Sequence, residues 1–163
     1  MKRIAILALL TLSTAVVIPF TARAQSKPDF SGTWTMDAAK SDPAPQGRGG
    51  GGGGGTQTVK QTATELSVQT EGRQGPQTMT YKLDGSKSTN KVMGRGGEQT
   101  VESTAKWDGS SLVIETTRDM GGMSITTKEV RRLDNGGKDM IVETTAQTPN
   151  GEQKRKVVYA KGM

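Results

Sequence analysis

The sequence contains no cysteine and no histidine among its 163 residues. Disulfides, Ser-His-Asp and Cys-His nucleophilic sites, common zinc sites and imidazole haem ligation are therefore excluded. Glu115 and Glu143 occupy matching places in a short internal repeat, but both are out of phase with their apolar neighbours, which predicts solvent-facing carboxylates. Met120 and Met123 could offer thioethers to copper(I), yet a glycine turn explains their spacing equally well. We expect a protein that is not an enzyme and that binds no metal or cofactor.

Large apolar side chains are scarce. After residue 24, Leu, Ile, Val and Phe make up roughly 12% of the chain, below the about 20% at which disorder becomes a concern. Disorder by that route also requires a high net charge, which this chain lacks. Threonine is abundant, and its β-branched side chain suits a pleated, half-buried surface. The composition predicts a β protein with a thin core.

The one long apolar run stands at the N-terminus. Two basic residues open the chain, and the apolar residues 4–18 follow until Pro19 ends the run. Such a run is too short to cross a bilayer comfortably. The small-x-small pattern of residues 22–24 is typical of a signal-peptidase site. We predict a signal peptide over residues 1–24 and export to the periplasm or the extracellular space.

The remainder of the chain, residues 25–163, has the length of one domain. Without the three basic residues of the leader, its formal net charge falls from +6 to +3. Scattered charges with so small a surplus do not indicate a nucleic-acid or membrane-surface partner. We expect a monomer without nucleic acid and without stable membrane insertion.

Period-two alternation recurs along this domain and predicts strands. The clearest runs are Thr78–Leu83, Val101–Trp107 and Leu112–Thr116. Asp-Gly or Asn-Gly dipeptides, which favour tight hairpins, follow such runs at residues 84–85, 108–109, 135–136 and 150–151. About nine or ten strands fit between Thr33 and Lys161, which predicts an all-β meander that forms a barrel or a sandwich.

A glycine-rich segment, residues 43–55, interrupts this pattern with seven consecutive glycines. A phosphate-binding loop would require a following Gly-Lys-Ser/Thr, which is missing. An RNA-binding Arg-Gly segment would require several arginines, and only Arg48 is present. Polyglycine has no side chain whose burial would offset its loss of entropy, so we predict a flexible loop.

The motif Phe30-x-Gly32-x-Trp34 opens the meander and resembles the start of the calycins, the lipocalins and fatty-acid-binding proteins. In those families Gly-x-Trp begins the first strand and the tryptophan plugs one end of the barrel. Gly32 would permit a sharp entry, and Trp34 would bury a large flat surface. The resemblance implies an up-and-down antiparallel, lipocalin-like barrel of about 8–10 strands, with Gly32, Trp34 and Trp107 in structural roles.

The C-terminal half resembles the fatty-acid-binding branch more closely. The matching segments, in order, are Lys106–Gly109, Arg131–Leu133, Met140–Glu143 and Val157–Lys161. In that branch two arginines and a tyrosine hold the ligand carboxylate. The resemblance assigns Tyr159 to the tyrosine and Arg131 to one arginine, whereas Val157 stands in place of the other. The lid of two helices has no counterpart, and residues 37–55 take its place.

The orientation of Arg131 is open from the sequence. Alternation along residues 125–133 places Arg131 inside, Val130 contradicts that phase, and a bulge would bring Arg132 inward instead. Both arginines could also be exposed. An inward guanidinium would need an anionic partner, which either Glu129 or a ligand carboxylate could supply.

The predicted ligand contacts are Arg131, Tyr159, Tyr81, Met79 and Met140, the last three because strand alternation turns them inward. An eight- to ten-stranded barrel has room for one small ligand. We therefore expect an exported lipocalin-like barrel that binds a small apolar or amphipathic molecule, a carboxylate being one form. The alternative is an envelope or protein-interaction module whose interior is simply packed.

Overall fold

The computed structural model describes residues 27–43, 55–72, 75–94, 97–119, 124–148 and 151–162. These residues form ten strands and one short 3-10 turn. The elements are β1 (Gly32–Met36), β2 (Thr56–Gln61), β3 (Glu65–Gly72), β4 (Gly75–Lys82), β5 (Lys87–Gly94), β6 (Gly97–Asp108), β7 (Ser111–Asp119), β8 (Ser124–Asp134), η1 (Asn135–Gly137), β9 (Asp139–Thr148) and β10 (Gly151–Lys161). The predicted signal peptide and residues 44–54 of the glycine-rich segment lie outside the described residues.

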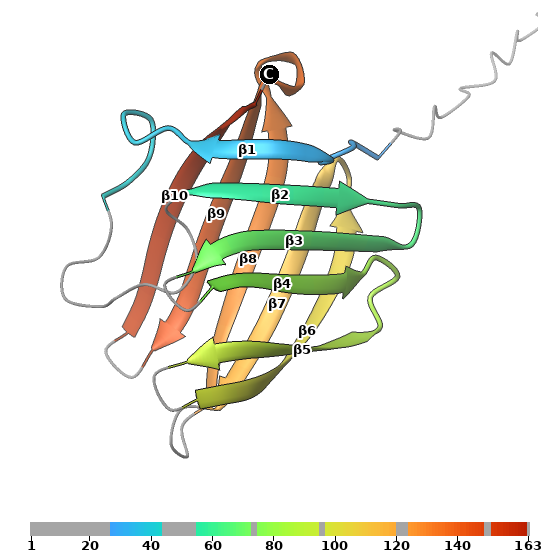
Figure 1. Ribbon diagram of the computed structural model, residues 1–163, viewed down its shortest axis with the longest axis vertical. Helices are drawn as coiled ribbons and strands as arrows, with labels where there is room; N and C mark the ends of the chain where they lie inside the picture. Colours follow the sequence, from blue (N-terminus) through green and yellow to red (C-terminus); the bar gives the residue numbers. More distant parts are fainter. Residues whose placement is uncertain are drawn as a thin grey trace, which may run out of the picture.

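The strands form one antiparallel sheet in the order β4-β3-β2-β1-β10-β9-β8-β7-β6-β5. Every hydrogen-bonded neighbour is adjacent in sequence except β1 and β10, whose pairing joins the two ends of the meander. In Figure 1, β1–β4 lie in front and cross β6–β10 behind them at a steep angle. The predicted all-β meander is confirmed, and it encloses an interior between two layers.

β4 and β5 meet at the two ends of the sheet but do not pair through their backbones. Side-chain hydrogen bonds connect them instead. The Asn90 side chain accepts from the Thr80 amide at 2.8 Å and donates to the Thr80 carbonyl at 3.0 Å. Ser88 Oγ accepts from the Lys82 amide at 2.8 Å. We call this junction the β4–β5 seam. Its side-chain bonds take the place of a backbone ladder, and the barrel is nearly closed.

The turns follow the dipeptide pattern. Asn135 and Gly136 have positive φ angles of 49° and 65°, the conformation that Asn-Gly pairs accept readily. The Asp-Gly pair at 84–85 lies between β4 and β5, and the pair at 108–109 begins at the last residue of β6 and leads into β7. Asn150 lies outside the described residues. Local turn chemistry therefore accounts for three of the reversals in the meander.

The segment after β1, residues 37–42, continues along β10. The Asp37 amide donates to the Val158 carbonyl at 2.8 Å, and the Asp42 amide donates to the Lys156 carbonyl at 2.9 Å. Ser41 Oγ accepts from the Val158 amide at 2.9 Å. Because β1 is short, this segment satisfies backbone groups of β10 that β1 does not reach.

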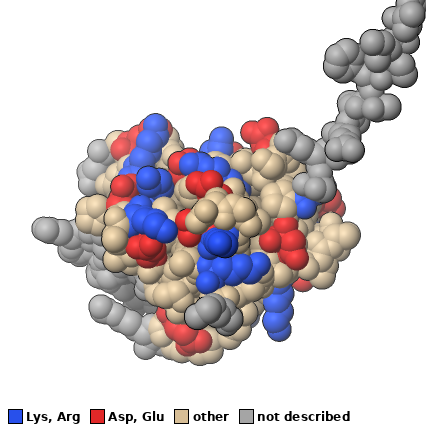
Figure 2. All heavy atoms as spheres, turned by 90° about the horizontal axis from the view of Figure 1, so that it is seen from above, with Lys and Arg blue, Asp and Glu red and all other residues tan. Residues whose placement is uncertain are grey.

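The outer surface carries mixed charge. Figure 2 shows Lys and Arg side chains interspersed with Asp and Glu over the face seen from above. Exposed pairs join neighbouring strands or residues: Lys87–Glu102 at 2.9 Å, Lys91–Glu98 at 2.7 Å and Lys154–Glu152 at 2.9 Å. Such pairs add little stability. In the described part of the chain, no helix has the length and apolar character needed to cross a bilayer.

Candidate ligand-binding interior

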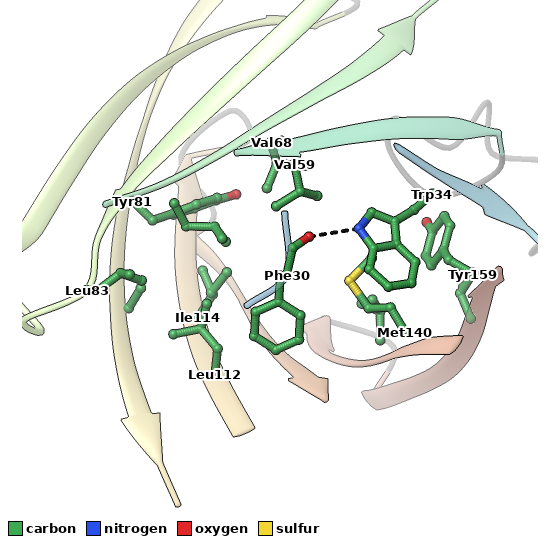
Figure 3. Packing of buried hydrophobic residues seen from close by; sticks show 14 residues of the cluster. Phe30, Trp34, Val59, Val68, Tyr81, Leu83, Leu112, Ile114, Met140 and Tyr159 are labelled. Carbon is green, nitrogen blue, oxygen red and sulfur yellow. Dashed lines mark hydrogen bonds between the residues drawn. The ribbon is translucent and has the colours of Figure 1, made fainter. Parts of the chain in front are cut away.

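An aromatic plug fills one end of the interior. Phe30 and Trp34 are both fully buried, and the Trp34 indole Nε1 donates to the Phe30 carbonyl at 2.8 Å (Figure 3). Phe30 also stacks on Trp107, with 6.0 Å between the ring centroids. Gly32 has a φ of 137°, and a Cβ there would lie 3.1 Å from Lys161 Cε. The positive φ therefore favours glycine at this entry, and a larger residue would also displace the end of the Lys161 side chain slightly.

Two side chains that were identified from the sequence, Met140 and Trp107, pack next to this plug. Met140 is fully buried and lies beside Trp34 in Figure 3, so it packs in the apolar core. Trp107 is only partly buried and lines a surface hollow of about 320 Å³ together with Lys27 and Leu83. Its Nε1 has no hydrogen-bond partner among the described residues.

Arg131 points into the barrel and is only 5% exposed. Its Nε donates to Glu129 Oε1, and its terminal nitrogen donates to Gln57 Oε1 at 3.2 Å. Gln57, 4% exposed, comes from β2 on the opposite layer. We call these three residues the Arg131 cluster. Of the two partners, the sequence pointed to Glu129, whereas Gln57 was missed because nothing local connects it to Arg131.

The pairing of β7 with β8 runs without a bulge through Val113 opposite Val130 and Leu112 opposite Arg131. The alternation is therefore unbroken, and the bulged alternative with Arg132 inward is wrong. Arg132 lies on the outer face, where it pairs with Glu143 at 2.9 Å.

Two buried tyrosines lie close enough to the Arg131 cluster to interact with its charges. Tyr81 and Tyr159 are each 6% exposed, and the Tyr81 hydroxyl donates to the partly buried Met79 sulfur at 3.4 Å. Burial raises the pKa of Tyr81, and the nearby Glu129 charge raises it further. Burial likewise raises the pKa of Tyr159. Both hydroxyls therefore keep their protons at neutral pH and can donate hydrogen bonds to an anion.

Arg131 itself remains a cation. Burial acts to lower the pKa of its guanidinium, but the charge of Glu129 and its hydrogen bond act in the opposite direction, and the pKa is raised overall. An arginine has five N–H donors, and Glu129 and Gln57 engage two of them. The remaining donors give this site the capacity to hold a carboxylate.

Two further arginines, Arg118 and Arg155, share the inner face and were missed from the sequence. Both are half-buried. Arg118 continues the alternation of the buried Ile114 on β7, and Arg155 continues that of the buried Tyr159 on β10. The charge of Arg118 acts to lower the pKa of Tyr81, and that of Arg155 acts to lower the pKa of Tyr159. The resemblance identified Tyr159, and period-two alternation counted back along the chain from that residue could have identified Arg155.

The half of the interior away from the plug is largely polar. Its inward-facing side chains with hydroxyl or amide groups include Thr70, Gln99, Ser103, Thr116, Thr127 and Thr144. Ser103 and Thr116 share a hydrogen bond of 2.8 Å across β6 and β7. The described residues contain no group of three or more acidic side chains placed to hold a metal ion.

Neither a protein-family model nor a curated protein matches this sequence. Among solved structures, a mutant of the fluorescent protein UnaG is 18% identical, with a TM-score of 0.53 over 82% of this chain and 96% of that chain. Zebrafish ileal bile acid-binding protein complexed with cholic acid is 14% identical, with a TM-score of 0.54 over 82% and 98%. A fatty-acid-binding protein of Manduca sexta is 20% identical, with a TM-score of 0.42 over 64% and 71%.

The first two of these structures establish the fold class of the chain. Each is covered almost completely by this chain, with a TM-score above 0.5, so the ten-stranded meander shares their overall fold. The protein has the calycin fold in its ten-stranded form, as the resemblance at Gly32 and Trp34 implied. At such low identity the likeness extends to the fold alone.

Proposed function

We propose that this protein is an exported barrel that binds a small amphipathic molecule in its interior, with an anionic end such as a carboxylate. The observation that carries the proposal is a buried arginine, Arg131, that interacts electrostatically with the buried tyrosines Tyr81 and Tyr159 inside a calycin barrel. Charge-assisted hydrogen bonds from these groups suit a carboxylate. The zebrafish structure of the same fold is complexed with cholic acid, which supports this ligand class.

Calorimetric titration of dodecanoate and of 1-dodecanol tests the proposal. The wild type should bind the acid, and Arg131→Gln should weaken that binding by about 1.5–3 kcal/mol, the scale of hydrogen bonds to a charged group. Binding of the alcohol should weaken much less, because the alcohol carries no charge. Arg132→Gln is the matched control, since Arg132 lies on the outer face of the same strand. An absence of binding to the wild type, or equal losses for acid and alcohol, contradicts the carboxylate site.

A second candidate is a protein-interaction or envelope module without a small-molecule ligand. It is favoured by the hydrogen bonds that Arg131 makes to Glu129 and Gln57, because these satisfy part of the cluster without a ligand. Native mass spectrometry of the purified protein separates the two candidates. A bound lipid or fatty acid supports the barrel as a carrier, whereas a ligand-free barrel that binds no amphiphile supports the module.

A further inference from the structure

Arg155 is an inward-facing cation that makes no ion pair or side-chain hydrogen bond with the described residues. Its Nε is buried and has no hydrogen-bond partner among the described residues. Exposed lysines flank it in sequence, and Val157 and Tyr159 on its own face are buried, so its side chain belongs to the interior. A buried donor without a hydrogen-bond partner carries its full desolvation penalty, and few donors in natural cores are left in that state.

Glu129 does not neutralise Arg155, although both lie in the same row of the sheet. In that row Arg155 is opposite Thr144, and Thr144 is opposite Glu129. Two strand spacings, about 10 Å, therefore separate the backbones of Arg155 and Glu129. The Glu129 carboxylate instead binds Arg131 on its own strand.

The interior consequently holds more positive than negative charge. The charged side chains of the described strands that face inward and are at least partly buried are Arg118, Glu129, Arg131 and Arg155. One carboxylate against three guanidinium groups leaves two positive charges. Arg118, like Arg155, has no ion pair or side-chain hydrogen bond within the described chain. A concave surface of one sign concentrates counter-ions of the opposite sign.

We infer that Arg155 contacts the anionic group of the ligand together with Arg131, with Tyr159 as a further donor and Arg118 as an additional charge. The ligand class is an amphiphile with a carboxylate or sulfonate headgroup that lies against β10, in the half of the interior away from the Trp34 plug. In this arrangement Glu129 holds Arg131 in place. The inference rests on the proposed function and adds Arg155 to Arg131 as a second arginine that contacts the anionic group.

The variants Arg155→Gln and Arg155→Lys test this assignment, with anilinonaphthalene sulfonate fluorescence as the readout and dodecanoate as the competitor. Arg155→Gln should weaken the binding of both anions about 10- to 150-fold. This ratio of dissociation constants corresponds to the loss of a hydrogen bond to a charged group. Arg155→Lys should retain part of the affinity because it keeps the charge. Lys156→Gln is the control, since it removes a charge from the exposed outer face of the same strand.

Thermal melting of the ligand-free proteins separates a binding role from a structural one. Arg155→Gln should leave the melting temperature unchanged or raise it, because it removes an unpartnered cation from beside other cations. A marked fall in melting temperature, or an affinity equal to that of the wild type, overturns the inference. Binding of the anions that survives Arg155→Gln removes only this assignment, whereas a wild type that binds neither anion removes the proposed function as well.

Discussion

The plugged end of the barrel and its charged middle, which is the Arg131 cluster, are both buried, but different interactions stabilise them. At the plug, Phe30 and Trp34 fill the space with apolar rings. The one indole hydrogen bond joins these two residues, which are only four positions apart in the sequence. In the middle, Arg131 depends on Gln57, which lies 74 residues away in sequence. Apolar packing tolerates small rearrangements, whereas a buried charge is stable only with its partner in place. The plug therefore contributes stability, and the charged middle provides the groups that can bind an anionic ligand.

The largest expected effect is at the plug. Trp34→Ala should lower the free energy of unfolding by about 3–5 kcal/mol, because it removes a fully buried indole and leaves a cavity. Urea denaturation followed by far-ultraviolet circular dichroism measures this change. Met93→Ala is the control, since Met93 is 47% exposed and should change stability by less than about 0.5 kcal/mol. Equal losses from the two variants would show that the plug is not a stabilising element.

Breaking the Arg131 cluster should have the next largest effect. Arg131→Met should destabilise the protein by about 2–4 kcal/mol, somewhat less than the loss of a fully buried pair because the Glu129 side chain is 25% exposed. Adding Glu129→Leu should restore much of that loss, because no unpaired charge then remains. The same denaturation measurement on the single and double variants gives the coupling energy. Additive losses would mean that the two residues do not act as a pair.

The β4–β5 seam provides a third, smaller test. Asn90→Ala should lower stability by about 1–3 kcal/mol, because both backbone groups of Thr80 lose their partners. Hydrogen exchange of the Thr80 amide should accelerate more than that of amides in the paired strand β9. Lys91→Ala, on an exposed neighbour, should change neither quantity. Protection of Thr80 that survives Asn90→Ala would show that the seam closes in another way.

The pH dependence of the free energy of unfolding tests the burial of Tyr81 beside the charged middle. The raised pKa of Tyr81 means that folding favours its protonated form, so this stabilisation is complete below the ordinary pKa of about 10 and is lost as the pH rises above it. The loss is at most about 1.4 kcal/mol per pH unit for each tyrosine. Urea denaturation at about pH 9 and about pH 11 should show a smaller decline for Tyr81→Phe than for the wild type. Equal declines would mean that the Tyr81 hydroxyl ionises freely in the folded barrel.

Much of the fold follows from local signals in the sequence. Alternation places Tyr81 and Leu83 on the inner face, and turn dipeptides such as Asn135-Gly136 mark the reversals. The motif at Gly32 and Trp34 identifies the fold class. These features depend on residues close together in the chain, because strand period and turn conformation are local properties.

Only the tertiary structure decided which side chains meet across the interior. No local pattern connects Arg131 with Gln57, joins Asn90 to Thr80 at the seam, or leaves the Arg155 Nε without a hydrogen-bond partner among the described residues. These outcomes depend on how two layers of strands cross and on which rows of the sheet face each other. The sequence by itself determined the strands, their turns and their inner faces, because these follow from neighbouring residues. The pairing of charges was decided by barrel closure, because it brings together residues that are distant in the chain.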